Sequence, residues 1–193
     1  MDYRRAFRSA AVSFADLIAR VPADRWDSPG LGDWTLRDLA GHAADSGLRQ
    51  VPGVLGNPDD EVERTSAEDY WLFARTVAPA EAGPALGDDP AAAVGDLVGL
   101  ATQALGKVED DDVVATPAGG MRVRDWLPTR TFELVVHGLD VAAAAGIEMF
   151  LGPEVFAEVA VQAARLAAAT GDGAVVVRAL TGRAGLPPGF SVV

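Results

Sequence analysis

The stretch Glu133-Leu-Val-Val-His137 joins a carboxylate to one of only two histidines in the chain. The residues around it, from about 125 to 145, predict one strong helix that ends at Gly146, a residue type favoured just after a helix. In a helix Glu133 and His137 are one turn apart, about 40° around the axis and about 6 Å along it. A carboxylate and an imidazole so placed can bind one metal ion from a single face.

The surroundings of Glu133 make an isolated carboxylate costly. Its neighbours are Phe132, Leu134, Val135 and Val136. A carboxylate among such side chains costs several kcal/mol unless it is paired or bound to a metal. The simpler alternative is a hydrogen-bonded pair between Glu133 and His137, worth about 0.2–0.5 kcal/mol. Both interpretations fit the spacing, which is common by chance.

His42, the other histidine, lies in a second predicted helix over about residues 36–50. Thr35 and Asp38 form a capping box that marks the start of this helix. His42 is therefore a candidate third ligand beside Glu133 and His137. Three protein ligands with a fourth position open are typical of catalytic rather than structural zinc. The alternative is a half-buried histidine bonded to a backbone carbonyl, in which case the protein is independent of metal.

Two acidic residues each follow a histidine by three positions: Asp45 follows His42, and Asp140 follows His137. Either carboxylate can orient the imidazole of its histidine from behind. The alternative for both is a surface acid on an amphipathic helix. Asp140 remains a candidate catalytic residue.

Arg130 lies one turn before Glu133 and is the second candidate catalytic residue. Its guanidinium can neutralise a substrate carboxylate or pair with Asp140 or Glu133. Trp34 and Trp126 each precede a candidate ligand closely. They are expected either to wall a pocket or to pack at the helix entries.

The rest of the chain predicts an all-α bundle of four to six helices with few strands. Apolar residues at helical spacing predict further helices over about residues 3–21, 67–77, 90–108, 155–169 and 174–180. Residues 113–123 predict irregular structure or a short hairpin, and Pro128 is expected in the first turn of its helix. We expect residues 1–170 to form the bundle and residues 171–193 to form a short helical segment and tail packed on it. Bundles build metal sites in the core from side chains on facing helices.

Composition excludes several classes of function. The net charge is −12 and the sequence pI is about 4.4, which argues against binding to nucleic acid or to an anionic membrane. The chain has no cysteine, so disulfides, iron–sulfur clusters and thiolate zinc sites are excluded. There is no pattern of a secretory signal or a membrane span. We expect a cytoplasmic protein, with a homodimer as one way to cover its apolar helices.

Two segments resemble one family. Leu31-Gly-Asp-Trp-Thr-Leu-Arg-Asp-Leu-Ala-Gly-His42 and Thr129-Arg-Thr-Phe-Glu-Leu-Val-Val-His-Gly-Leu-Asp140 are similar to the mycothiol-dependent maleylpyruvate isomerases of actinobacteria, a branch of the DinB-like metal-binding bundles. The end of the chain, Arg178-Ala-Leu-Thr-Gly-Arg-Ala-Gly-Leu-Pro-Pro-Gly-Phe190, also resembles members of this family. The likeness covers nearly the whole chain.

The resemblance implies a DinB-like four-helix bundle with additional short helices. It also implies a divalent metal, zinc or alternatively nickel, bound by His42, Glu133 and His137. The thiol mycothiol would then be a co-substrate whose sulfur approaches the open metal position, adds to a substrate double bond and leaves after rotation. The lack of cysteine is consistent with a thiol supplied from outside.

The chain also departs from that family. The characterised isomerases carry a further C-terminal domain that helps bind thiol and substrate, whereas only a short segment follows the bundle here. The resemblance therefore predicts the ligand set better than it predicts maleylpyruvate as substrate. The expected function is a metal-dependent, thiol-using isomerase or S-transferase acting on a small electrophile. The alternative is a non-catalytic metal-binding bundle that serves as a sensor or interaction module.

Overall fold

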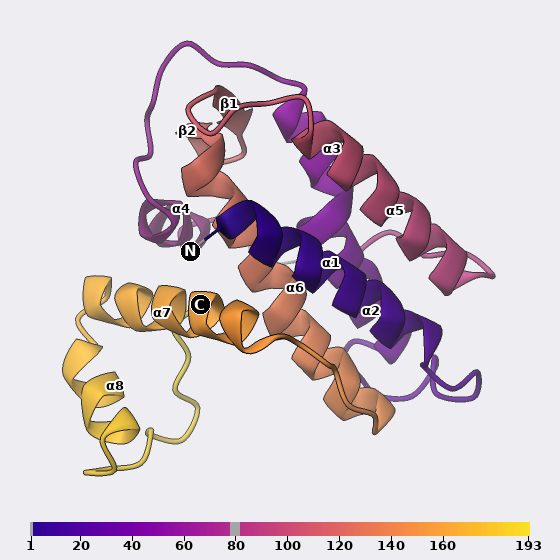
Figure 1. Cartoon of the computed structure of the whole chain (residues 1–193). Helices are drawn as coiled ribbons and strands as arrows, with labels where there is room; N and C mark the ends of the chain where they lie inside the picture. The colour runs from indigo at the N-terminus through magenta and orange to yellow at the C-terminus, as the bar shows by residue number, and fades with distance from the viewer. Residues whose placement is uncertain (1, 78–81) are drawn as a thin grey trace.

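The computed structural model describes residues 2–77 and 82–193, and its centre is a four-helix bundle (Figure 1). The bundle consists of α1 (Tyr3–Ala19), α5 (Pro90–Leu105), α6 (Val123–Ala145) and a composite helix made of α2 (Leu36–Ala44), η1 (Asp45–Arg49) and α3 (Gln50–Leu55). α1 packs against α5 and α6, and the composite helix packs against the same two. The all-α prediction is confirmed.

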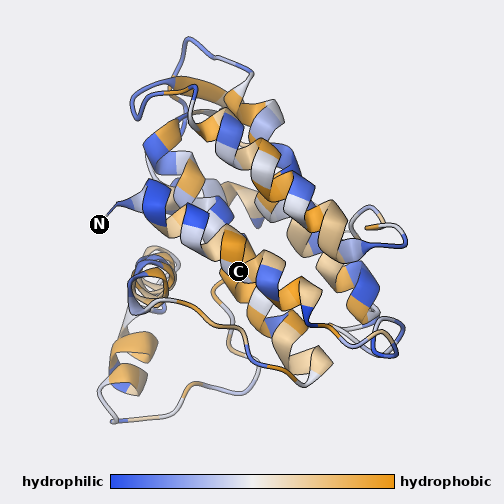
Figure 2. Ribbon diagram, turned by 45° about the vertical axis from the view of Figure 1, so that its right-hand side comes forward, coloured by the Kyte–Doolittle hydropathy of each residue, from blue (hydrophilic) through white to orange (hydrophobic). Residues whose placement is uncertain are grey.

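The core fills the space between these four helices. Apolar residues recur at helical spacing along α1 and α2, so one face of each is hydrophobic, whereas α6 is buried on most of its sides (Figure 2). The largest core side chains that are completely covered include Phe7, Phe14, Leu39, Leu48, Leu105 and Leu127. Burial of these faces, rather than helix propensity alone, holds the helices in place.

Side-chain caps fix where several helices begin. Thr35 accepts a hydrogen bond from the backbone N–H of Asp38, whose carboxylate accepts one from the N–H of Thr35, and this completes the predicted capping box. Ser66 caps α4 (Ala67–Ala74), and Asp89 caps α5 ahead of Pro90. These caps satisfy N–H groups that have no partner within the helix.

α6 differs from its prediction at one end. It starts at Val123, two residues early, so Pro128 lies in the second turn rather than the first. The helix ends as expected at Gly146, which adopts a left-handed conformation with φ 72°.

The composite helix is longer and less regular than its prediction. It continues past Gln50 to Leu55, so Pro52 lies inside the composite helix, after the π-helical turn. Residues Asp45–Arg49 form a π-helical turn. Such turns insert an extra residue and re-aim the side chains around it.

Residues 113–122 form a short hairpin, one of the two expectations for residues 113–123. β1 (Val113–Thr116) pairs antiparallel with β2 (Gly119–Arg122), with Val113 opposite Arg122 and Thr116 opposite Gly119. The hairpin leads directly into α6 and fixes the start of that helix.

The C-terminal part adds two helices outside the four. α7 (Pro153–Ala169) packs on α1, α4 and α6. α8 (Gly173–Leu180) contacts α7, buries none of its residues and lies to the side of the bundle (Figure 1). Of the tail after α8, Val192 packs partly against the core. None of the helices within residues 2–77 and 82–193 has the length and hydrophobicity needed to cross a membrane.

Candidate metal centre

α2 and α6 bring together the three residues that the sequence suggested as ligands. One nitrogen or carboxylate oxygen from each of His42, Glu133 and His137 lies within 4.8 Å of the others. Nε2 of His137 is 3.3 Å from Oε2 of Glu133, and the two imidazole rings meet edge to face with centroids 4.8 Å apart. Residues 91 positions or more apart in the chain thus meet because α2 and α6 pack face to face.

This donor set fits a divalent metal. Two imidazoles and one carboxylate form a known ligand combination of catalytic zinc sites. Donor atoms around a tetrahedral zinc ion lie roughly 3.4 Å apart, given bonds of about 2.1 Å. The two donors on α6 already stand 3.3 Å apart.

The site lies at the edge of the core. The side chain of His137 is 20% exposed and that of Glu133 is 12% exposed. Both side chains are therefore mostly covered by the bundle, and a small part of each is in contact with solvent.

His137 has a strongly raised affinity for a proton. Burial by itself lowers its pKa, but hydrogen bonds to the Asp140 and Glu133 carboxylates outweigh burial and raise the pKa of His137 to about 9. For Glu133, burial by itself raises the pKa. The hydrogen bond with His137 and the charge of Arg130 outweigh it and hold the pKa of Glu133 below its ordinary value. The two groups thus form a charged pair when no metal is bound.

Asp140 lies behind His137. Its Oδ2 is 3.3 Å from Nδ1 of His137. In the neutral imidazole, a proton held on Nδ1 by Asp140 leaves the lone pair on Nε2, the nitrogen that lies beside Glu133. Carboxylates commonly orient metal-binding histidines in this way. Asp45, the corresponding acid after His42, instead pairs with Arg49 at 3.2 Å.

Ser46 contributes to the site, although the sequence did not single it out. Its Oγ is 3.0 Å from Oε2 of Glu133 and 2.9 Å from the carbonyl oxygen of His42. Ser46 belongs to the π-helical turn η1 and is 6% exposed. Its position close to the helical face of His42 was the only signal in the sequence.

Arg130 lies deep in the core at 1% exposure rather than at the surface. Its Nη1 donates to the carbonyl oxygen of Ser46 at 2.8 Å, and its Nε donates to Oγ1 of Thr129 at 3.0 Å. The guanidinium lies against the rings of Tyr70 and Trp126. Arg130 therefore acts on the protein interior and is separated from solvent.

The two tryptophans take different places. Trp126 is completely buried beneath Arg130, as expected of a packing residue. The ring of Trp34 lies 5.0 Å from the ring of His42 and is half-buried. Trp34 thus forms one wall beside the three candidate ligands.

A loop also presses on α2 at His42. A Cβ atom placed on Gly83 would lie 2.2 Å from the backbone nitrogen of His42 and from the backbone carbon of Gly41. Only glycine permits so close an approach. This contact fixes the backbone that carries His42.

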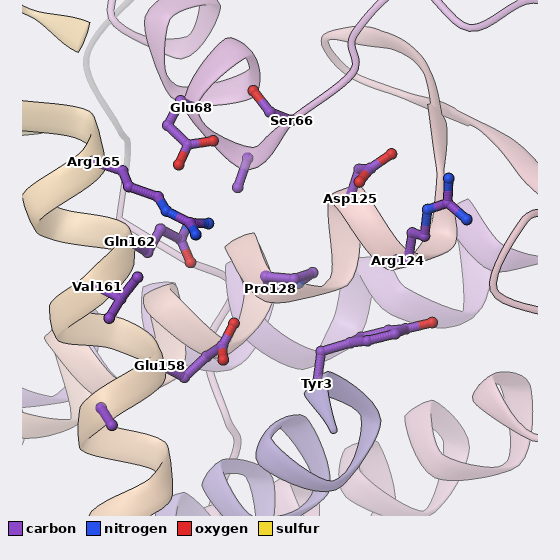
Figure 3. Close-up of a pocket in the computed structure, with 12 residues that line it drawn as sticks. Tyr3, Ser66, Glu68, Arg124, Asp125, Pro128, Glu158, Val161, Gln162 and Arg165 are labelled. Atoms are coloured by element: carbon purple, nitrogen blue, oxygen red, sulfur yellow. The ribbon is translucent and has the colours of Figure 1, made fainter. Parts of the chain in front are cut away.

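A separate cavity of about 500 Å³ opens between α4, α6 and α7 (Figure 3). Glu68, Asp125, Glu158 and Arg165 give it a mixed charge. Burial raises the pKa of Asp125 despite the nearby arginines Arg124 and Arg122. None of the three candidate ligands lines this cavity.

Comparison with known proteins identifies one family. The model of the mycothiol maleylpyruvate isomerase N-terminal domain matches residues 7–142, well over half of the chain. Two similar proteins come from Mycobacterium tuberculosis: uncharacterized protein MT0763 of strain CDC 1551 / Oshkosh and uncharacterized protein Rv0738 of strain H37Rv. Each is 29% identical over 170 residues, which span 88% of this chain and 78% of the relative. No solved structure matches.

The matched region contains all three candidate ligands and the whole four-helix bundle except the start of α1 before Phe7 and the end of α6 after Ala142. The chain therefore belongs to the family of the mycothiol maleylpyruvate isomerase N-terminal domain.

Proposed function

We propose that this protein is a metal-dependent, mycothiol-using enzyme, an isomerase or thiol S-transferase that acts on a small electrophile in the cytoplasm. The observation that carries the proposal is the meeting of His42, Glu133 and His137, whose ligand atoms lie within 4.8 Å of one another. Membership of a family described by a mycothiol-dependent reaction supports the choice of thiol.

In this proposal His42, Glu133 and His137 hold a divalent ion, zinc being the first choice and nickel the second. A bound ion of this kind lowers the pKa of a thiol or water that it contacts. Asp140 holds the Nδ1 proton of His137, at 3.3 Å, and keeps Nε2 available as a donor. Ser46 holds the Glu133 carboxylate in place.

The partial exposure of the ligands favours an enzyme over a closed structural site. The side chains of His137 and Glu133 are 20% and 12% exposed, so an ion held between them would not be sealed inside the core. Structural zinc sites have four protein ligands and no open position.

The first test is metal content. Protein purified without added metal, or reloaded with zinc after chelation, should hold about one ion per chain by elemental analysis. His42→Ala and Glu133→Ala should each lose most of it, because each leaves only two of the three protein ligands that a catalytic zinc site has. Arg165→Ala, on the exposed face of α7, serves as a control that should bind like the wild type.

The second test separates an enzyme from a metal-binding module. The visible spectrum of the cobalt-substituted protein should change when mycothiol is added, as a sulfur ligand enters the open position. Metal content without any response to mycothiol would favour the non-catalytic alternative. A folded wild-type protein that takes up no zinc, cobalt or nickel would contradict the proposal altogether.

A further inference from the structure

We infer that Arg130 is a positioning residue for Glu133, which it holds in place through Ser46 and the π-helical turn Asp45–Arg49. The inference rests on the metal site proposed above. It explains how the Glu133 carboxylate is held in position, and it assigns a role at the metal site to the buried guanidinium of Arg130.

Among the residues that the structure describes, Arg130 has no carboxylate in direct contact, although its charge acts on Glu133 at longer range. It is 1% exposed, yet within the described ranges no carboxylate oxygen lies within 4.0 Å of its guanidinium nitrogens. Its Nη2 likewise finds no hydrogen-bond partner in the part of the chain that the structure describes. Burying a charge is costly, and this cost is reduced by stacking on Tyr70 and Trp126 and by the attraction between Arg130 and Glu133. The cost points to a role beyond packing.

What Arg130 does contact is the backbone of the π-helical turn. Its Nη1 donates to the carbonyl oxygen of Ser46 at 2.8 Å. The charge of the guanidinium strengthens this bond relative to a neutral one. Nε of Arg130 is itself held by Thr129 at 3.0 Å, so the donor is fixed on α6 one turn before Glu133.

The π-helical turn then sets the direction of the Ser46 side chain. An extra residue within the turn rotates the positions on either side of it relative to a regular helix. In this register Oγ of Ser46 lies 3.0 Å from Oε2 of Glu133. Gly47 permits the close packing, because a Cβ atom there would lie 2.5 Å from the Leu134 side chain.

Together these contacts connect α6 and η1 at two points. α6 supplies Arg130 and Glu133, and η1 supplies the carbonyl and the hydroxyl of Ser46 that bind them. Arg130 fixes the backbone of Ser46. The single hydroxyl proton of Ser46 is shared between Oε2 of Glu133 and the carbonyl oxygen of His42, so this hydroxyl links the two candidate ligands. Outer partners of this kind typically contribute 10–100-fold to metal affinity.

Metal affinity in a double-mutant cycle tests the inference. Zinc affinity is measured by competition with a chromophoric chelator for the wild type, Arg130→Met, Ser46→Ala and the double variant, each checked for folding by circular dichroism. Each single variant should bind zinc about 10–100-fold more weakly. Both substitutions act through the same contact with Glu133. The double variant should therefore bind zinc only slightly more weakly than the single variant with the lower zinc affinity.

Conservative variants distinguish positioning from general stability. Ser46→Thr keeps the hydroxyl and should restore much of the affinity, whereas Ser46→Ala should not. The cobalt spectrum of Ser46→Ala should also shift, because the carboxylate ligand is no longer held in one orientation. Arg165→Met, an exposed arginine with no ion pair within the described residues, is the matched control for Arg130→Met and should bind like the wild type.

Failure of the inference and failure of the proposed function give different results. If folded wild-type protein binds no metal, the metal site itself is wrong and the inference falls with it. If the wild type binds zinc and folded Ser46→Ala binds it equally tightly, the inference alone is wrong. The inference would also be wrong if the fold-loss of zinc affinity in the double variant equalled the product of the two single-variant losses. If Arg130→Met does not fold, the zinc affinities of Ser46→Ala and Ser46→Thr test the inference.

Discussion

At the scale of single residues, the site is organised around His137. Asp140 lies at its Nδ1 and Glu133 at its Nε2, each at 3.3 Å. Two carboxylates around one imidazole favour its protonated form, so the pKa of His137 rises to about 9. Without metal, this proton compensates the negative charge of Glu133. With metal, the ion takes over that role and the proton must leave.

This arrangement predicts that the stability of the metal-free protein depends on pH. The pKa of His137 is raised from 6.5 in the unfolded chain to about 9 in the fold. Its contribution is therefore fully present below pH 6.5 and is lost as the pH rises through 9. We expect the free energy of unfolding to fall by about 3 kcal/mol at most over this range, at 1.4 kcal/mol per pKa unit.

Chemical denaturation of chelator-treated protein at pH 6.5, 7.5 and 9 measures this effect. His137→Gln is the control, because it removes the titrating group and should flatten the profile. A wild-type profile as flat as that of His137→Gln would show that the fold does not raise the pKa of this histidine.

At the scale of elements, the backbone of α2 at His42 is fixed by its neighbours. The capping box of Thr35 and Asp38 sets where the helix starts. Gly83 presses on the backbone of Gly41 and His42 at a distance that leaves no room for a side chain. The position of the third ligand thus depends on a loop contact as well as on the bundle.

Gly83→Ala is therefore expected to disturb the site. The new methyl group would overlap backbone atoms at 2.2 Å, which cannot rotate away. We expect a loss of about 1–3 kcal/mol in the free energy of unfolding, together with weaker zinc binding, because the loop or α2 must shift. Urea denaturation and zinc competition measure the two effects.

Gly95→Ala is the matched control for Gly83→Ala. Gly95 is an exposed residue of α5, and a Cβ atom there meets nothing within 4 Å. Alanine in a helix interior should stabilise the protein by about 0.5–1 kcal/mol and leave zinc binding unchanged. Equal behaviour of the two variants would mean that the loop does not constrain His42.

At the scale of the whole molecule, the four-helix bundle carries the candidate site and the C-terminal helices lie beside it. α8 buries no residue, and Val177 and Leu180 are 61% and 78% exposed. An eight-residue helix of this kind gains little from its own hydrogen bonds. The bundle should therefore not need it.

Removal of residues 173–193 tests this division. We expect the shortened chain to keep its helical bundle and its zinc affinity, and to lose only about 1 kcal/mol or less, from contacts such as that of Val192 with the core. Circular dichroism, urea denaturation and zinc competition compare it with the full chain. Unfolding of the shortened chain would show that the tail is part of the bundle.

Local patterns in the sequence determined the fold class and most of the helices. Apolar spacing, the capping box at Thr35 and the stop at Gly146 act over a few residues, and the structure confirms them. The spacing of Glu133 and His137 fixes their shared face in the same way. These features depend on residues that are close together in the chain, so they can be predicted from the sequence alone.

Only the tertiary structure decided what surrounds that pair. His42 meets it because α2 packs on α6, and Ser46 reaches Glu133 because of a π-helical turn that no local pattern predicted. The burial of Arg130, with its bond to the Ser46 carbonyl, likewise depends on helices far apart in the chain. Such contacts arise from how whole faces pack, and periodicity gives the face of a residue but not its partner.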